Sequence, residues 1–363
     1  MSHASHRLVG RSPICCLVPP YVLSRIAEHG DLEQREKAVR TLAIDHTLRF
    51  GRAQTATLLA ARASAPDVLA GMTGGRVQRT IFDTHASEDL SQATVVRTEG
   101  GDPVSDQAVN DVYDNLGYTY TFYWDVVQRH SIDDRGLPLL GFVHFGQDYD
   151  NAMWDGHRMI FGDGDGRILQ NLANSIDVTA HELTHGVTQY TSALVYQTQS
   201  GALNESLSDV FGSMVKQYTL KQTADQADWL IGAGCLGPDV KGKALRSMAE
   251  PGTAYQDMLG QSDPQVGHMR DYIKTAQDNG GVHLNSGIPN RAFYLAATTI
   301  GGNAWEKAGR IWYEANRDPR MRPTVGFKTF AATTVRAANH LYGGSSGEVA
   351  AVHDAWEEVG IDL

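Results

Sequence analysis

The sequence predicts an α+β protein with a β-rich N-terminal half and a helical C-terminal half, preceded by a small helical module. Short apolar runs rich in β-branched and aromatic residues, typical of strands, begin at residue 77 and end before residue 175. From residue 175 onward, apolar residues recur mostly at helical spacing. Residues 21–62 also have helical spacing, and a stretch containing Gly and Pro separates them from the first strand.

The expected elements follow the chain in order. Gly30-Asp31 predicts a break within the first helical segment, and residues 63–77 are expected to form a linker. We therefore divide the chain into residues 1–75, 76–188 and 189–363. Strands are expected at residues 77–82, 93–97, 139–144 and 159–161, a long amphipathic helix at 106–129, and further helices at 176–191, 203–222, 287–301, 303–316, 324–341 and near 347–359.

Composition excludes several classes of function. The formal net charge of −11 argues against nucleic acid or an anionic membrane as the main partner. No apolar run approaches the length of a membrane span. The three cysteines form no readable disulfide framework. Residues 13–23 are apolar, but Pro19-Pro20 interrupts them, so the N-terminus does not resemble an ordinary secretory signal.

His181-Glu182-Leu183-Thr184-His185 is the strongest chemical signal, an H-E-x-x-H motif. On a helix the two histidines share one face, so both imidazoles can bind one zinc ion while the glutamate reaches a water on that ion. The alternative is a helix that carries two unrelated histidines.

A catalytic zinc site needs a third protein ligand and an open position. Glu205 follows His185 after 19 intervening residues, and it shares a helix face with Asp209. Glu205 is therefore the candidate third ligand, while Asp209 and Asn204 are candidates to orient the distal nitrogens of the two histidines. A solvated helix carboxylate is the alternative for Glu205.

A second candidate cluster lies far downstream. Asp278 precedes His283 by five residues, and the Gly280-Gly281 pair between them fits a tight turn. A histidine oriented by an aspartate is a good donor to a developing oxyanion. A lone histidine of this kind is more often structural, so context decides between the two interpretations.

Together these segments resemble the thermolysin family of neutral zinc metallopeptidases over about residues 78–363. The resemblance implies a two-lobed fold with the zinc helix between the lobes. It also implies metal-assisted peptide hydrolysis, with one zinc held by His181, His185 and Glu205 and with Glu182 as general base. A catalytically dead scaffold and a binding module with structural zinc are the rival classes. The matching segments are residues 149–156, 162–166, 176–188, 201–209, 245–248 and 278–287.

The resemblance assigns further roles within the expected site. His283, oriented by Asp278, and Tyr196 would donate to the oxyanion, and Arg246 would bind a carbonyl just past the cleaved bond. Asn151 and the backbone of Ala152 would hold the substrate main chain. An apolar pocket implies cleavage on the amino side of bulky hydrophobic residues. The pocket would be lined by Leu169, Leu172, Val178 and Leu245.

The N-terminal module resembles the short-propeptide, protealysin-like branch of the family, on the residues Pro19-Pro20-Tyr21-Val22-Leu23. This implies that residues 1–75 are a propeptide with its linker, an intramolecular inhibitor removed by autoprocessing near residues 70–80. We expect a monomer that acts on proteins and peptides and is secreted by a non-standard route, with a cytoplasmic location as the alternative. A thiolate of Cys15 or Cys16 at the open zinc position is one hypothesis, and packing of the cysteines against the body is the favoured one.

The sequence departs from the family near the zinc helix. The best-known members hold two calcium ions there, and Asp177 and Asp228 keep their places, but Lys216, Leu230 and Ala233 stand where carboxylates are expected. Fewer carboxylates cannot neutralise two divalent cations, and a lysine ammonium can replace the metal charge. We therefore predict no double-calcium site. A smaller departure is Met153, in place of a more usual aromatic, which we expect to loosen the substrate cleft.

Overall fold

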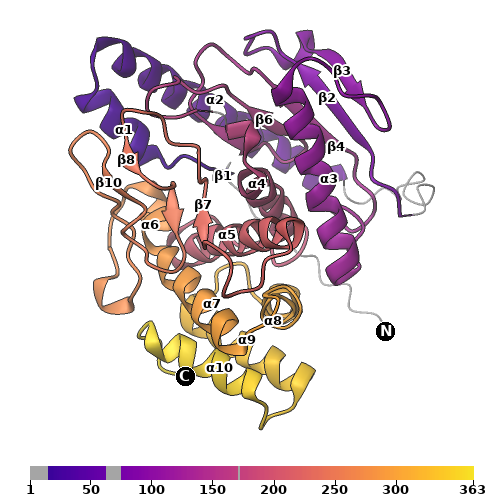
Figure 1. Ribbon diagram of the computed structural model, residues 1–363, viewed down its shortest axis with the longest axis vertical. Helices are drawn as coiled ribbons and strands as arrows, with labels where there is room; N and C mark the ends of the chain where they lie inside the picture. The colour runs from indigo at the N-terminus through magenta and orange to yellow at the C-terminus, as the bar shows by residue number, and fades with distance from the viewer. Residues whose placement is uncertain (1–14, 63–74, 171) are drawn as a thin grey trace.

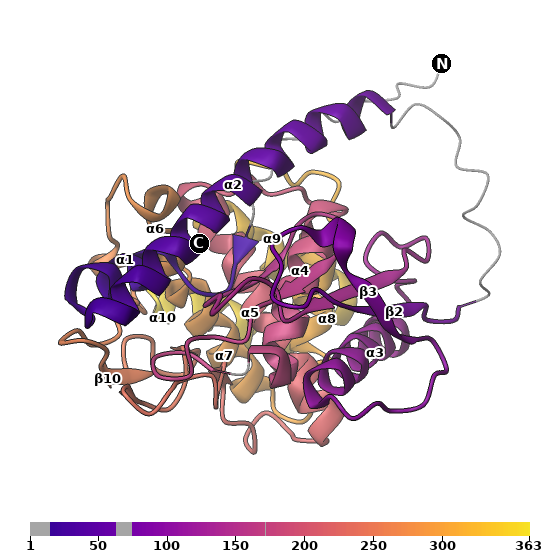
Figure 2. The same ribbon diagram turned by 90° about the horizontal axis from the view of Figure 1, so that it is seen from above.

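A computed structural model describes residues 15–62, 75–170 and 172–363, with side chains described for residues 16–48, 75–170 and 172–363. The predicted α+β architecture is confirmed (Figure 1). A sheet dominates the N-terminal lobe, helices build the C-terminal lobe, and the helix α4 (Ile176–Gln189) lies between them. The two helices that follow the N-terminal strand run across the outside of the rest of the molecule (Figure 2).

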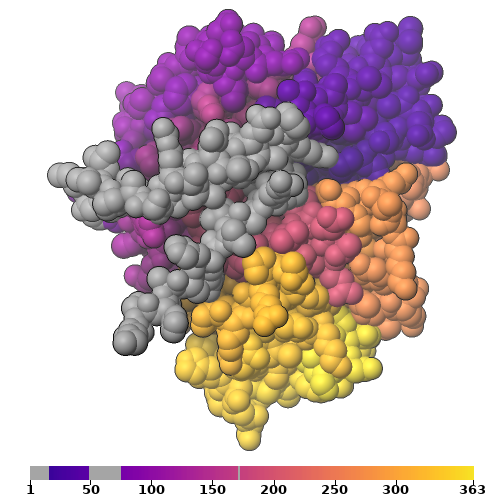
Figure 3. Space-filling model, turned by 180° about the vertical axis from the view of Figure 1, so that it is seen from behind, coloured from indigo at the N-terminus to yellow at the C-terminus, as the bar shows by residue number. Residues whose placement is uncertain are grey.

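The N-terminal module consists of α1 (Pro20–His29) and α2 (Leu32–Arg62), as predicted. Pro20 opens α1, where its missing N–H costs nothing. Asp31 starts the second helix, because its Oδ1 accepts from Gln34 N at 3.0 Å while Gln34 Oε1 accepts from Asp31 N at 2.9 Å. Seen from behind, the module lies against both the sheet lobe and the middle of the C-terminal lobe (Figure 3). Most of the predicted linker lies outside the described residues.

The main sheet has six strands in the order β1-β5-β6-β4-β2-β3. The pairs β2–β4 and β4–β6 are parallel, and the other pairs are antiparallel. The four predicted strands are confirmed, whereas β1 and β5 were not predicted. The strands are β1 (Cys15–Cys16), β2 (Arg79–Asp83), β3 (Thr94–Thr98), β4 (Leu139–Val143), β5 (Ala152–Trp154) and β6 (Met159–Phe161).

The long helix α3 (Gln107–Val127) packs on this sheet. Asp106 caps it by accepting from Ala108 N at 2.9 Å. A Cβ at Gly141 of β4 would lie 2.6 Å from Val112 Cγ1, so a glycine is required for the helix to approach the sheet this closely.

The C-terminal lobe is helical, as predicted, although two helix starts differ by about five residues and the short helix α6 (Asp278–Asn285) was not predicted. α5 begins at Thr198 rather than near residue 203, and α8 begins at Ala308 rather than 303, because residues 304–307 form a turn. Gly201 lies inside α5, where a Cβ would lie 2.5 Å from Val282 Cγ1, so this glycine reflects packing and not a helix break. The helices are α5 (Thr198–Leu220), α6 (Asp278–Asn285), α7 (Gly287–Ile300), α8 (Ala308–Asn316), α9 (Phe327–Tyr342) and α10 (Gly347–Glu358).

Short elements complete the described chain. Two small antiparallel sheets pair β7 with β9 and β8 with β10. No helix in the described ranges is long and apolar enough to cross a bilayer. The bounds are β7 (Leu230–Ile231), β8 (Lys241–Gly242), β9 (Arg246–Ser247), β10 (Tyr255–Asp257), and the 3-10 turns η1 (Leu90–Gln92), η2 (Leu172–Asn174) and η3 (Met269–Asp271).

Two apolar clusters hold these parts together. The larger runs through both lobes and includes Leu17, Leu23 and Ile26 of the N-terminal module. The smaller lies between α2 and the sheet and is formed by Cys16, Ile44, Phe142, Phe145, Tyr149, Met153 and Ile160. The N-terminal module is therefore packed into the body by both clusters.

Candidate active site

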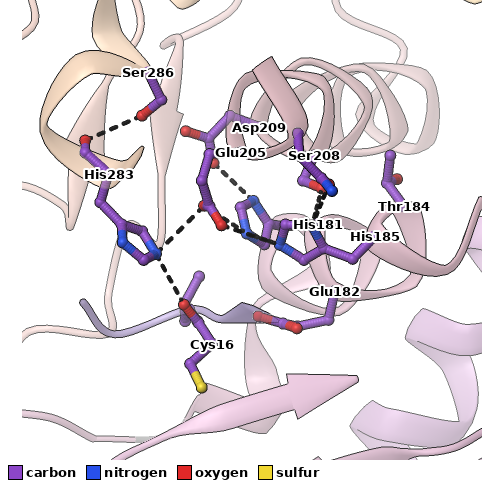
Figure 4. Close-up of polar contacts among 12 residues, drawn as sticks. Cys16, His181, Glu182, Thr184, His185, Glu205, Ser208, Asp209, His283 and Ser286 are labelled. Atoms are coloured by element: carbon purple, nitrogen blue, oxygen red, sulfur yellow. Dashed lines mark hydrogen bonds and ion pairs between the residues drawn. The ribbon is translucent and has the colours of Figure 1, made fainter. Parts of the chain in front are cut away.

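Helix α4 places the H-E-x-x-H side chains at the bottom of the interlobe site. His181 and Glu182 are fully buried and His185 nearly so. The Nε2 atoms of the two histidines lie 3.0 Å apart, and candidate ligand atoms of all three residues lie within 4.8 Å of one another. The helical spacing predicted from the sequence thus brings both imidazoles to one point (Figure 4).

Glu205 of α5 faces this point from the other side. Its Oε2 lies 3.5 Å from His181 Nε2, and its Oε1 lies 3.5 Å from His185 Nε2. Four donors around zinc with bonds of about 2.0 Å would be about 3.3 Å apart, so this spacing fits one ion. Glu205 Oε2 is also buried without a hydrogen-bond partner, which fits a cation ligand.

The distal nitrogens of both histidines have partners. Asp209 Oδ1 accepts from His181 Nδ1 at 2.8 Å, and Asn204 Oδ1 accepts from His185 Nδ1 at 2.8 Å. Ser208 Oγ lies 3.0 Å from the same His185 nitrogen. These acceptors hold the ring protons on Nδ1 and leave both Nε2 lone pairs for a metal. Ser208 was not predicted, although its i+4 spacing from Asn204 was a usable signal.

Asp209 also binds Arg246 of β9. Arg246 Nε donates to Asp209 Oδ2 at 2.9 Å, and Asn290 Nδ2 donates to the same oxygen at 2.8 Å. Burial alone would raise the pKa of Asp209, but the charges of Arg246 and His181 hold it below its usual range. The carboxylate therefore stays ionised. Asn290 was not predicted, because nothing in its local sequence marks it.

His283, Asp278 and Tyr196 gather at one edge of the site. Asp278 Oδ1 lies 2.6 Å from His283 Nδ1, and its Oδ2 accepts from His283 N at 2.8 Å. Gly280 and Gly281, with φ of 85° and 78°, make the turn that brings these residues together. Tyr196 Oη lies 3.2 Å from His283 Nε2 and donates to Glu205. The sequence predicted the first pair from its spacing.

Glu182 has the environment of a general base. Its Oε2 accepts from Trp154 N at 2.9 Å, and its buried Oε1 has no hydrogen-bond partner. Burial raises the pKa of Glu182 to about 8. A carboxylate with this pKa binds and releases a proton near neutral pH.

The edge of β5 holds the chain's own N-terminal segment. Ala152 O accepts from Leu17 N at 3.2 Å, and Asn151 Oδ1 accepts from Val18 N at 3.0 Å. Arg246 NH1 donates to Leu17 O at 3.1 Å. All three groups expected to hold a substrate main chain therefore bind residues 17–18.

The four expected pocket residues are buried in the same apolar cluster as Leu17. Leu169 and Leu172 precede α4, Val178 lies within α4, and Leu245 directly precedes β9. Their exposed fractions are 0% for Leu169, Leu172 and Val178 and 6% for Leu245.

The cysteines and Met153 take different positions. The sulfur of Cys16 points away from His181 and His185 (Figure 4), and its side chain lies in the smaller apolar cluster. Met153 is fully buried in that cluster, opposite Cys16 in the strand pair. The side chain of Cys15 lies outside the described residues.

Lys216 lies in the region for which we predicted no double-calcium site. Its Nζ lies 2.9 Å from Asp177 Oδ2 and 2.9 Å from Asp228 Oδ1. It also donates to Leu230 O at 2.7 Å. An ammonium therefore sits between the two remaining carboxylates, and the absence of calcium stays a prediction.

A two-lobed fold that carries two histidines and a buried glutamate on its central helix is typical of zinc metallopeptidases. The family model for the thermolysin metallopeptidase catalytic domain matches residues 72–189, and the model for the alpha-helical domain matches residues 192–361. The chain belongs to the thermolysin family, and it is a metalloendopeptidase. Membership implies a catalytic zinc, which the group on α4 fits.

Individual relatives agree along nearly the whole chain. An extracellular metalloprotease of Pectobacterium carotovorum subsp. carotovorum is 48% identical, and the match covers 97% of each chain. Protease PrtS of a Photorhabdus strain is 43% identical over 96% of this chain and 92% of its own. The solved precursor of protealysin, a metalloproteinase from Serratia proteamaculans, is 50% identical, with a TM-score of 0.85, and the match covers 96% of this chain and 99% of that one. The chain is thus similar to short-propeptide members, including a solved precursor.

Proposed function

We propose that this chain is the precursor of an endopeptidase that cleaves on the amino side of bulky hydrophobic residues. We further propose that residues 1–75 are its self-processed, inhibitory propeptide, followed by catalytic lobes at residues 76–188 and 189–363. One observation carries both proposals. Leu17 is fully buried in the cleft, and its main chain is held by Ala152 and Arg246.

The proposed roles follow from the geometry. Zinc held by His181, His185 and Glu205 would polarise a carbonyl and acidify a water. Glu182 would take the proton from the water and pass it to the leaving amine, as its pKa near neutrality suits.

The oxyanion would be stabilised by His283 and Tyr196, each typically worth ~3 kcal/mol. Asp278 would orient His283 through the contact at 2.6 Å. Arg246 would hold the carbonyl after the cleaved bond. Ala152 would accept from the main-chain amide just before that carbonyl, and Asn151 would accept from the amide just after it.

Export, oligomeric state and calcium complete the proposal. A relative described as an extracellular metalloprotease supports secretion, and we propose that this protein is secreted, with a cytoplasmic location as the alternative. We propose a monomer that acts on proteins and peptides. The ion pairs of Lys216 support the absence of a double-calcium site.

Two peptides that differ only after the cleaved bond test the specificity. We expect a quenched fluorescent peptide with Leu at that position to be cleaved far faster than its Asp counterpart, and phenanthroline to abolish cleavage. Equal rates for the two peptides would refute the pocket assignment. Mass spectrometry of the N-terminus of wild type and of Glu182→Ala tests self-processing, which only the wild type should show.

A further inference from the structure

Residues 16–18 lie in the cleft as a substrate would, not merely across it. β1 runs antiparallel to β5, with Cys16 opposite Met153. Cys16 O lies 3.2 Å from His283 Nε2, and the next carbonyl, Leu17 O, accepts from Arg246. This is the order expected of a reacting carbonyl followed by the carbonyl just past the cleaved bond. The peptide bond between Cys16 and Leu17 therefore occupies the position of the bond to be cut.

Contacts on the far side of this bond fix its register. Leu17 N donates to Ala152 O at 3.2 Å, and Val18 N donates to Asn151 Oδ1 at 3.0 Å. The fully buried Leu17 belongs to the cluster that contains Leu172 and Val178. A shift by one residue would put the opposite side chains into the cleft and break these hydrogen bonds.

Helix α2 fixes the same register from behind. Asn151 Nδ2 donates to Asp45 Oδ2 at 2.9 Å, which leaves Asn151 Oδ1 to accept from Val18. Asp45 Oδ1 accepts from Tyr149 Oη at 2.5 Å. Asp45 is only 1% exposed, so these bonds hold the substrate-binding edge firmly while the module is in place.

We propose that the Cys16–Leu17 peptide bond is a cleavage site of this chain's own active centre. This rests on the proposed function. A water oxygen bonds to the carbonyl carbon of Cys16, and the bond from that carbon to Leu17 N breaks. Glu182 carries one proton from the water to the Leu17 amine, and the second proton leaves the new carboxyl group for the same amine, which becomes an ammonium. The products are residues 1–16, ending in a new carboxylate, and a chain that begins at Leu17.

This cut is distinct from removal of the propeptide. After it, α1 still packs through Leu23 and Ile26, and Arg25 NH2 still donates to Leu259 O at 2.9 Å. The chain that begins at Leu17 therefore keeps its helical module docked. The cut trims the precursor without by itself uncovering the cleft.

Mass spectrometry of zinc-loaded full-length protein tests the proposal. We expect a new N-terminus at Leu17 that appears at a rate independent of protein concentration over a 100-fold dilution series. Leu17→Asp should lower that rate by about 100-fold or more, since a carboxylate does not fit an apolar pocket, while Leu17→Met should keep the cut. Full-length Glu182→Ala should stay intact at this bond even when wild type is added, because its own cleft shields the bond.

A second measurement does not depend on catalysis. In metal-free Glu182→Ala, the backbone amides of Leu17 and Val18 should be protected from hydrogen exchange. The double variant that also carries Leu17→Asp should exchange these amides faster. Unprotected amides would overturn the register. A wild type that cleaves an external peptide but never yields Leu17 as N-terminus, or yields it in proportion to concentration, would overturn self-cleavage while leaving the proposed function intact. Failure to cleave any peptide would instead refute the proposed function.

Discussion

The carboxylate of Asp209 joins the metal-binding and substrate-binding side chains. Its Oδ1 accepts from both His181 Nδ1 and Arg246 NH2 at 2.8 Å. All three side chains are buried, so their charges are weakly screened. A change at Asp209 should therefore disturb zinc binding and substrate binding together.

Asp209→Asn should lower zinc affinity by about 10- to 100-fold, the usual effect of losing such an orienting carboxylate. It should also raise KM, because Arg246 loses its charged partner. Chelator competition measures the first effect and peptide kinetics the second. Asp271→Asn, on the exposed turn η3, is the matched control and should change neither. Unchanged zinc affinity in Asp209→Asn would contradict the role of this carboxylate.

Glu182→Gln and Glu182→Ala should retain zinc and lose hydrolysis by at least about 10²- to 10⁴-fold, the typical range for a general base. The residue touches Trp154 N but is not needed to hold the ion in the proposed ligand set. Elemental analysis gives the zinc content and a fluorescent peptide gives the rate. Substantial remaining activity in either variant would refute the assignment of Glu182.

Lys216→Met should destabilise the fold by about 3–5 kcal/mol, because it leaves buried Asp177 without its opposite charge. Lys241→Met, on the exposed strand β8, is the matched control. Denaturant unfolding measures both variants. Wild type should show no pair of tight calcium sites by calorimetry. Two such sites that depend on Asp177 would show that the lysine does not replace the metal.

Because of His144, the free energy of unfolding should depend on pH in the alkaline range. Its Nδ1 lies 2.9 Å from Asp163 Oδ1 and its Nε2 lies 2.8 Å from Asp106 Oδ2, and these hydrogen bonds, with that of Asp163 the larger, raise its pKa to about 9. The unfolded value is about 6.5. Because the folded pKa is the higher one, the stabilisation is complete below about pH 6.5 and is lost as pH rises through about 9.

The measurement is the free energy of unfolding of wild type and His144→Gln at pH 6, 7.5 and 9.5. The difference between them should shrink as the pH rises. A difference between wild type and His144→Gln that stays constant with pH would contradict a charged His144.

Local sequence patterns were sufficient to predict much of the fold and of the candidate site. Helical periodicity predicted α3, α4, α7, α9 and α10 to within a few residues. Their spacing in the sequence also predicted that His181, His185 and Glu205 lie together. In the structure they meet between two packed helices.

What the sequence did not indicate depends on distant contacts. β1 contains two residues, and its pairing with β5 spans more than 130 positions of chain. Similarly, Asn290 and Asp45 acquire their roles only because α7 and α2 pack beside Asp209 and Asn151. The helix predicted at residues 203–222 left Gly201 outside, but in the structure Gly201 lies inside α5 in close contact with Val282.

The candidate metal-binding and catalytic side chains come from both sides of the turn between α4 and α5. His181, Glu182 and His185 precede this turn, and Glu205 and His283 follow it. A backbone break there would give two fragments, each with an incomplete set of metal and catalytic side chains. Peptidase activity would then appear only when the two fragments associate again. The chain thus offers a natural division point for a split reporter of protein association.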